Sequence, residues 1–252
     1  MTRSITIDRE PELALFDSVI AGIADDRILL IEAASGVGKT ALLREFDHRH
    51  PKDVRFAKID FKGSSTSLAD LLSRLCDTLG WDHFPTLTAE VKNISSPAVN
   101  VSNNTMLGQN QIEVYLSGRD EQEREVRRTT LTDSFFADLR KLGKTTLIFD
   151  TFEQCDDTVT KWIAGEFLSR AHRSVDLVII IAGQRVPEQT IEWECHHHKL
   201  KGISHEYWHQ YAQSIGAAVT LEFIKGCCSL CNGHPMTMKT HIDGMATQRQ
   251  LA

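Results

Sequence analysis

The segment at residues 28–40, ILLIEAASGVGKT, contains the residue types and the spacing that bind a phosphate chain. Its apolar start predicts a short buried strand, and a loop of small residues leads from that strand to Lys39 and Thr40, where a helix begins. A loop of this kind can turn successive backbone N–H groups inward around phosphate oxygens. Lys39 can reach the β- and γ-phosphates, and the Thr40 hydroxyl is suited to Mg²⁺.

The loop follows the pattern G-x-x-x-x-G-K-[ST] at every position but the first, where Ala33 replaces glycine. Alanine is tolerated there if its φ is negative. The alternative, a glycine-rich turn that merely joins a strand to a helix, is disfavoured by the strand–loop–helix context. The nucleotide-binding residues expected in this segment are Ala34, Ser35, Gly36, Val37, Gly38, Lys39, Thr40 and Ala41.

A second candidate group follows the apolar run at residues 145–149, which predicts a buried strand that ends at Asp150. Active sites of open α/β sheets lie at this end of the strands, so Asp150 is expected to hold Mg²⁺ opposite Thr40. Glu153 is placed to orient an attacking water. A strand-terminal acid and a solvated glutamate at a helix start are the alternatives for Asp150 and Glu153.

A third candidate is Arg185, which follows the apolar run at residues 177–182. A cation at the tip of a neighbouring strand can sense the γ-phosphate. A solvated loop arginine explains the same spacing equally well. The expected catalytic residues are therefore Glu153, Lys39 and Arg185.

Composition fits a water-soluble chain of 252 residues, 41% of them hydrophobic, with a formal net charge of −6. The longest aliphatic run is too short to span a bilayer, and charge occupies the N-terminal stretch where a signal peptide needs an apolar segment. The negative charge argues against a general nucleic-acid binder without excluding one. The six cysteines are irregularly spaced, so we expect reduced thiols in a cytoplasmic protein.

Predicted strands alternate with predicted helices, which indicates an α/β fold with a parallel sheet covered on both faces. The strands are expected at residues 28–31, 54–61, 145–150 and 177–182, and the helices at residues 10–24, 67–79, 119–142 and 159–171. Residues 83–118 are rich in Asn, Ser and Thr, and we expect a flexible, exposed insertion there, with a loose hairpin.

Two further clusters carry weaker hypotheses. Cysteines and histidines near residues 195–198 and 227–234 are zinc-ligand types, but no spacing matches a zinc finger, and small apolar packing explains the cysteines better. The arginines at 124, 127 and 128 could supply an arginine finger or a nucleic-acid contact. Because they alternate with acids, a solvated helix face with ion pairs is favoured.

Together these motifs resemble the STAND class of P-loop NTPases, which includes the NB-ARC and NACHT branches of the AAA ATPase domains. The resemblance extends to three other segments: Asp8–Leu13 is similar to the family's GRE-x-EL motif, Ala182–Arg185 to its TSR sensor, and Asn232–Met236 to its GxP motif. The order and spacing of the motifs also fit. The departures are Ala33 in the loop, Asp8 for the motif's glycine, and Gly183-Gln184 in the sensor.

The resemblance implies an ASCE-type P-loop domain at residues 1–202 and a small helical lid at residues 203–252. It implies ATP or ADP with Mg²⁺ as cofactors, with Arg9 near the adenine and Pro235 against the nucleotide. It also implies a switch that is closed with ADP and opens to assemble with ATP, in signalling or defence. Partners are then further copies of the chain or a separate sensor or effector protein.

The function expected from the sequence is an ATP-binding switch with slow, Mg-dependent hydrolysis. A turnover ATPase of the AAA+ type that remodels a protein or nucleic acid is the main alternative. A small-molecule kinase and a non-hydrolysing nucleotide-binding scaffold stay open as well. The kinase leaves the motif around Pro235 without a role.

Overall fold

The computed structural model describes residues 8–63, 66–94 and 108–250. Its strands are β1 (Ile28–Glu32), β2 (Arg55–Asp60), β3 (Thr145–Asp150), β4 (Leu177–Gly183) and β5 (His196–Lys199). The longer helices are α1 (Glu10–Ala21), α2 (Lys39–Arg49), α3 (Leu68–Leu79), α4 (Pro85–Ile94), α5 (Gln109–Leu116), α6 (Glu121–Leu139), α7 (Asp157–Trp162), α8 (Leu168–His172), α9 (His205–Ser214), α10 (Leu221–Cys231) and α11 (Pro235–Gln250). None of the described helices has both the length and the apolar character needed to cross a membrane.

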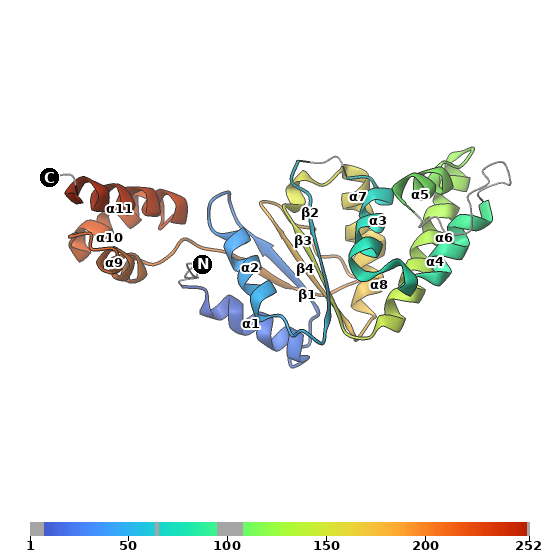
Figure 1. The fold of residues 1–252 in the computed structure, drawn as a ribbon, viewed down its shortest axis with the longest axis horizontal. Coiled ribbons are helices and arrows are strands. Elements are labelled where there is room, and N and C mark those ends of the chain that lie inside the picture. The colour runs from blue at the N-terminus through green and yellow to red at the C-terminus, as the bar shows by residue number, and fades with distance from the viewer. Residues whose placement is uncertain (1–7, 64–65, 95–107, 251–252) are drawn as a thin grey trace. The chain divides into compact units, whose positions relative to one another are not determined.

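The five strands form one sheet in the order β2-β3-β4-β1-β5 (Figure 1). Strand β3 pairs in parallel with both β2 and β4. Every residue of β3 and β4 is buried, which explains the unbroken apolar runs that these strands show in the sequence. The predicted parallel α/β fold is confirmed, and the short edge strand β5 is an addition that the sequence did not predict.

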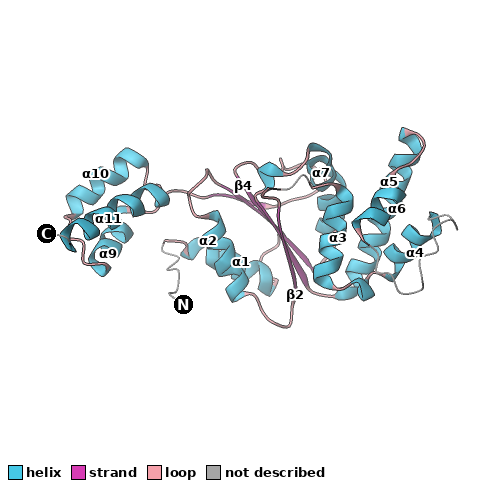
Figure 2. Ribbon diagram, turned by 45° about the horizontal axis from the view of Figure 1, so that its top comes forward, coloured by secondary structure: helices cyan, strands magenta, loops and turns pink. Residues whose placement is uncertain are grey.

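The chain divides into two compact units. The first contains residues 1–24, 31–50 and 197–252, and the second contains residues 25–30 and 51–196. In the first unit, α9, α10 and α11 enclose a small core of their own (Figure 2). The members of that core are Trp208, Ala212, Ala217, Ile224, Met238 and Ile242.

The second unit carries a layer of helices that the sequence did not predict. Within residues 83–118, the described residues form α4 and α5, which pack with α3 and α6. Phe84, Leu87 and Val91 are fully buried, and so is Ile112. The expectation of an exposed hairpin was therefore wrong for these residues, because burial against neighbouring helices outweighs their polar composition. Residues 95–107, the middle of the expected insertion, lie outside the described residues.

A buried carboxylate joins α6 to the start of α4. Asp138 is completely buried, and its Oδ2 accepts hydrogen bonds from the backbone N–H groups of Thr86 at 2.7 Å and Leu87 at 3.0 Å. Its Oδ1 accepts from the Thr86 hydroxyl at 2.6 Å and from Lys141 at 2.9 Å. These bonds satisfy N–H groups that every helix start leaves without an internal partner.

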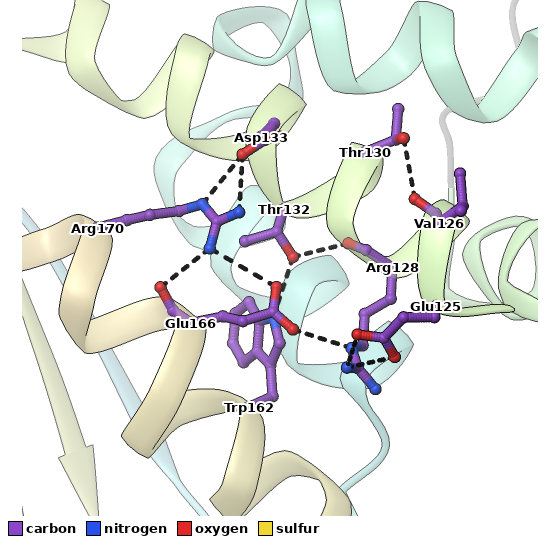
Figure 3. Close-up of polar contacts among 9 residues, drawn as sticks. All are labelled: Glu125, Val126, Arg128, Thr130, Thr132, Asp133, Trp162, Glu166 and Arg170. Carbon is purple, nitrogen blue, oxygen red and sulfur yellow. Dashed lines mark hydrogen bonds and ion pairs between the residues drawn. The ribbon is translucent and has the colours of Figure 1, made fainter. Parts of the chain in front are cut away.

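The charged face of α6 is used for packing within the second unit (Figure 3). Arg128 of α6 pairs with Glu166 at 3.1 Å, and Arg170 of α8 pairs with Asp133 of α6 at 2.9 Å. The helix α6 therefore contributes the arginine to one of these ion pairs and the acid to the other. The arginines at 124, 127 and 128 each pair with an acid three or four residues away. The ion pairs predicted for these arginines are confirmed, but only Arg124 is exposed, and the side chains of Arg127 and Arg128 are partly buried.

The burial of Asp138 predicts a large loss of stability on its removal. Asp138→Ala leaves the amides at the start of α4 without acceptors, and we expect the free energy of unfolding to fall by about 3 kcal/mol in urea denaturation. Asp133→Ala is the matched control on the same helix. Its ion pair is exposed, so the loss is expected to stay below about 1 kcal/mol. Equal losses in the two variants would contradict this assignment.

The same carboxylate predicts a pH dependence. Burial alone raises the pKa of Asp138, but the hydrogen bonds from Thr86, Lys141 and Leu87 outweigh it, so the pKa lies below its ordinary value. A lowered pKa in the folded state stabilises the fold above the unfolded pKa, and this stabilisation disappears as the pH falls through the folded value. The difference in unfolding free energy between the wild type and Asp138→Asn should therefore shrink between about pH 7 and about pH 2. A constant difference would contradict the assignment.

Candidate functional site

The phosphate-type loop in the first unit joins β1 to α2. Gly36 and Gly38 have φ values of 79° and 105°, a region that residues with a Cβ rarely adopt. A Cβ added to Gly38 would have no atom within 4 Å, so the loop is open at this point. Ala33 keeps a negative φ, which explains why alanine can replace the first glycine of the pattern.

Lys39 closes the loop from its own first helical turn. Its Nζ donates hydrogen bonds to the carbonyl oxygens of Ala33 at 2.5 Å and Ala34 at 3.1 Å. Thr40 follows with its side chain exposed to solvent. The ammonium group of Lys39 and the exposed hydroxyl of Thr40 therefore lie at the start of α2, at the positive end of the helix dipole.

Arg9, the residue just before α1, contacts the loop. Its guanidinium is buried, and Nη2 donates to the carbonyl oxygens of Val37 at 3.0 Å and Lys201 at 2.9 Å. Nη1 lies 3.6 Å from the carboxylate of Glu12, which also accepts a hydrogen bond of 3.0 Å from His198. Arg9 thus joins three chain segments through its hydrogen bonds to Val37 and Lys201, and its charge is paired with the buried carboxylate of Glu12.

Asp8 explains one departure from the family pattern. It has a φ of 60°, a conformation that glycine adopts freely and that aspartate tolerates better than most residues. Its carboxylate accepts a hydrogen bond of 2.8 Å from the backbone N–H of Ser204. An aspartate at this position therefore keeps the backbone turn and adds a bond to the segment before α9.

The Gly-x-Pro segment, Gly233–Pro235, contacts the loop through the side chain of its middle residue, His234. His234 Nε2 is 2.8 Å from the carbonyl oxygen of Ser35, 199 positions away in the sequence. Gly233 packs against the backbone of Ile203 and donates nothing to the loop itself. Pro235 occupies the first position of α11, where its missing N–H costs nothing.

These contacts share one effect on the loop. Side-chain donors hold the carbonyl oxygens of Ala33, Ala34, Ser35 and Val37. Because N–H and C=O point in opposite directions in a trans peptide, holding a carbonyl on one side turns the amide that follows it to the other. A phosphate chain needs several loop amides in fixed directions, and the held carbonyls restrict these directions.

The second unit contains the acidic candidates. Asp150 ends β3 with its side chain buried, and Oδ2 lies 3.3 Å from Nζ of Lys58 on β2. Oδ1 accepts a 2.9 Å hydrogen bond from the N–H of Thr151. Thr151 has a φ of 58°, an unfavourable conformation for a β-branched residue, and such strain is typical of functional sites.

Glu153 is held in place by the residue that follows β4. Its Oε2 accepts the backbone N–H of Gln184 at 2.8 Å, and its Oε1 accepts the side-chain amide of Gln184 at 3.1 Å. A Cβ on Gly183 would lie 2.4 Å from the carbonyl oxygen of Arg185 and 2.9 Å from Glu153 Oε2, so the end of the strand needs glycine. Arg185, the next residue, is exposed.

The structure therefore brings the predicted residues together in two sets. Lys39, Thr40, Arg9 and Pro235 belong to the first unit, and Asp150, Glu153 and Arg185 belong to the second. Sequence reasoning missed the partners that hold these residues: Lys58, Gln184, His198 and His234. For His234 there was a signal, because it is the middle residue of the Gly-x-Pro motif.

Thiol and zinc chemistry have no support among the described residues. All six cysteines are free, and burial raises the pKa of Cys155, Cys195 and Cys228 to about 11, which keeps them protonated. In the part of the chain that the structure describes, no group of three or more Cys, His, Asp or Glu side chains could hold a metal ion.

A comparison with protein families gives the class of the chain. The parallel sheet and the loop between β1 and α2 are those of a P-loop NTPase. A family described as "AAA ATPase domain" matches residues 7–181, which is more than half of the sequence. The chain therefore belongs to the AAA ATPase domain family. None of the curated proteins matches it.

Solved structures agree on the fold. A Walker-type ATPase of Pyrococcus abyssi matches with a TM-score of 0.55 at 18% identity, covering 99% of this chain and 72% of that one. A STAND protein with a tetratricopeptide repeat sensor from Pyrococcus horikoshii matches with a TM-score of 0.55 at 16% identity, covering 93% of this chain and 29% of that one. The Drosophila ORC bound to DNA matches with a TM-score of 0.53 at 16% identity, covering 94% and 60%.

The network around Arg9 yields a prediction for stability. Arg9→Met removes the cation from a buried carboxylate, and we expect urea denaturation to show a loss of about 3 kcal/mol in the free energy of unfolding. Arg49→Met is the matched control, because Arg49 pairs with Asp17 at the surface and its loss should cost less than about 1 kcal/mol. Adding Glu12→Gln to Arg9→Met should recover part of the loss. A double variant no more stable than Arg9→Met would contradict the buried pair.

Proposed function

We propose that this chain is an ATP-binding molecular switch of the STAND type, with slow Mg-dependent hydrolysis, in which the bound nucleotide controls the position of the C-terminal helices. The observation that carries the proposal is the loop between β1 and α2, whose carbonyls are held by Lys39, Arg9 and His234. One of these three donors comes from the C-terminal helices. A change in the loop on nucleotide binding is therefore transmitted to them directly.

At the phosphate site, we propose roles for Lys39, the loop amides, Arg9 and Pro235. Lys39 and the loop amides neutralise the β- and γ-phosphates. The position of Lys39 at the end of the loop and the dipole of α2 both favour an anion there. The adenine is expected near Arg9 and the nucleotide against Pro235. The buried guanidinium of Arg9 supports an indirect contribution, because its donors already hold Val37 and Lys201.

For Mg²⁺ and hydrolysis, we propose roles for Thr40 of the first unit and for three residues of the second unit. Thr40 and Asp150 would hold Mg²⁺, which supplies charge neutralisation at the phosphates when it is bound. The Nζ of Lys58, 3.3 Å from Asp150 Oδ2, supports a fixed position for this carboxylate. Glu153 would orient the attacking water, and Arg185 would sense the γ-phosphate. The hydrogen bonds from Gln184 to both oxygens of Glu153 support slow turnover, because they compete with the bond to water.

Assembly is the output that follows from this arrangement. The γ-phosphate distinguishes ATP from ADP, and a switch needs a ligand that binds one conformation more tightly than the other. We propose that ATP favours association with further copies of this chain or with a separate sensor or effector. Steady hydrolysis stimulated by a protein or nucleic acid would point instead to a remodelling ATPase.

Lys39→Ala should abolish ADP and ATP binding in isothermal titration calorimetry, because the loop loses its only side-chain cation aimed at the phosphates within the described segment 33–41. Arg44→Ala, an exposed cation on the same helix, is the control and should bind like the wild type. Thermal unfolding of both variants checks that they fold. Near-wild-type affinity in Lys39→Ala would overturn the phosphate site.

Glu153→Gln should separate binding from hydrolysis. The amide cannot accept a proton from water, so we expect affinity for Mg-ATP to stay within about threefold while single-turnover hydrolysis falls at least about a hundredfold. Glu188→Gln, at an exposed residue after β4, is the control and should hydrolyse ATP like the wild type. Unchanged hydrolysis in Glu153→Gln would remove Glu153 from the mechanism.

A further inference from the structure

The backbone of His234 is fixed on both sides. The N–H of Ile203 donates to the carbonyl of Gly233 at 2.9 Å, and the N–H of Met238 donates to the carbonyl of His234 at 2.9 Å. A Cβ on Gly233 would lie 2.2 Å from the carbonyl oxygen of Ile203, so only glycine allows this approach. The imidazole of His234 therefore starts from a rigid position at the beginning of α11.

Two separate contacts determine which ring nitrogen of His234 carries the proton. Nε2 faces the carbonyl oxygen of Ser35 at 2.8 Å, and because a carbonyl only accepts, Nε2 must be the donor. Nδ1 faces the backbone N–H of Thr237 at 3.4 Å and its hydroxyl at 3.1 Å. A backbone N–H only donates, so Nδ1 must be the acceptor. Together, a donor at Nε2 and an acceptor at Nδ1 define the tautomer with hydrogen on Nε2.

The ring also touches the loop backbone. A Cβ added to Gly36 would lie 2.5 Å from Cε1 and 2.9 Å from Nε2 of His234. It would also lie 3.4 Å from Cβ of Met236. Two separate features therefore require glycine at position 36: its φ of 79°, and the imidazole of His234, which occupies the space where a Cβ would lie.

These contacts fix the peptide group between Ser35 and Gly36. The group is planar and trans, so its N–H points away from the side on which its carbonyl lies. Holding the Ser35 carbonyl at His234 therefore directs the Gly36 amide away from the imidazole. An amide directed in this way is preorganised for an anion, because no rotation of the peptide is needed on binding.

We propose that His234 is a positioning residue of the nucleotide site, which orients the Gly36 amide for a nucleoside di- or triphosphate and thereby couples phosphate binding to α11. The inference rests on the proposed function of the loop. It adds a residue whose side chain acts on the loop backbone. The ligand that His234 affects is the phosphate chain of the nucleotide, because His234 contacts the loop that we propose binds this chain.

Calorimetric titration of the full chain with ADP tests the proposal. His234→Ala should weaken ADP binding by about tenfold, which corresponds to about 1.4 kcal/mol. His234→Gln can place an amide N–H near the position of Nε2, and it should recover affinity to within about threefold of the wild type. His241→Ala, an exposed histidine on the same helix, is the matched control and should bind ADP unchanged.

Nitrogen-15 NMR of the histidine rings supplies a readout that a merely structural role would not move. The wild-type chain should show His234 as the neutral ring with the proton on Nε2, and ADP should shift its signals while those of His241 stay in place. The opposite tautomer would overturn the proposal. If His234→Ala does not fold, His234→Gln and this spectrum of the wild type still decide the matter.

Failure of this inference is distinguishable from failure of the proposed function. If Lys39→Ala binds ADP normally, the loop is not the phosphate site and the proposed function falls. If Lys39→Ala loses ADP while His234→Ala binds it as tightly as the wild type or more tightly, the loop assignment stands and the role of His234 is refuted.

Discussion

The arrangement of the first unit depends on how the carbonyl oxygens of one loop are held. A glycine-rich loop has many accessible conformations, and a phosphate site needs one of them. Lys39, Arg9 and His234 each donate to loop carbonyls and so remove that freedom. The three donors come from α2, from the start of α1 and from the start of α11, so the loop is the point where distant parts of the chain meet.

This arrangement requires charged side chains to be buried, which is unfavourable unless each charge is paired. Arg9 is buried and needs the nearby carboxylate of Glu12, which in turn needs His198 on the edge strand. Gly233 and Gly36 allow backbone and ring to approach at distances that no Cβ would tolerate. Paired polar side chains, and glycines that leave room for close contacts, therefore determine the geometry around the loop more than the burial of apolar surface does.

Local patterns could be predicted from the sequence, and long-range pairing could not. The loop and the buried strand that ends at Asp150 are encoded in continuous segments, and both were identified correctly. The helical spacing of Phe84, Leu87 and Val91 was present but hidden by surrounding Asn, Ser and Thr, so α4 was missed. The bond from His234 to Ser35 joins residues 199 positions apart, which no local pattern contains.

Hydrogen–deuterium exchange with and without ADP tests the coupling between the loop and α11, because it reports on the loop and on the C-terminal helices in one experiment. We expect ADP to slow exchange in residues 34–40 and in α11 together, with the Gly233–Pro235 turn included. Protection of the loop with unchanged exchange in α11 would contradict the coupling between them. Unchanged exchange in both, at saturating ADP, would contradict the phosphate site itself.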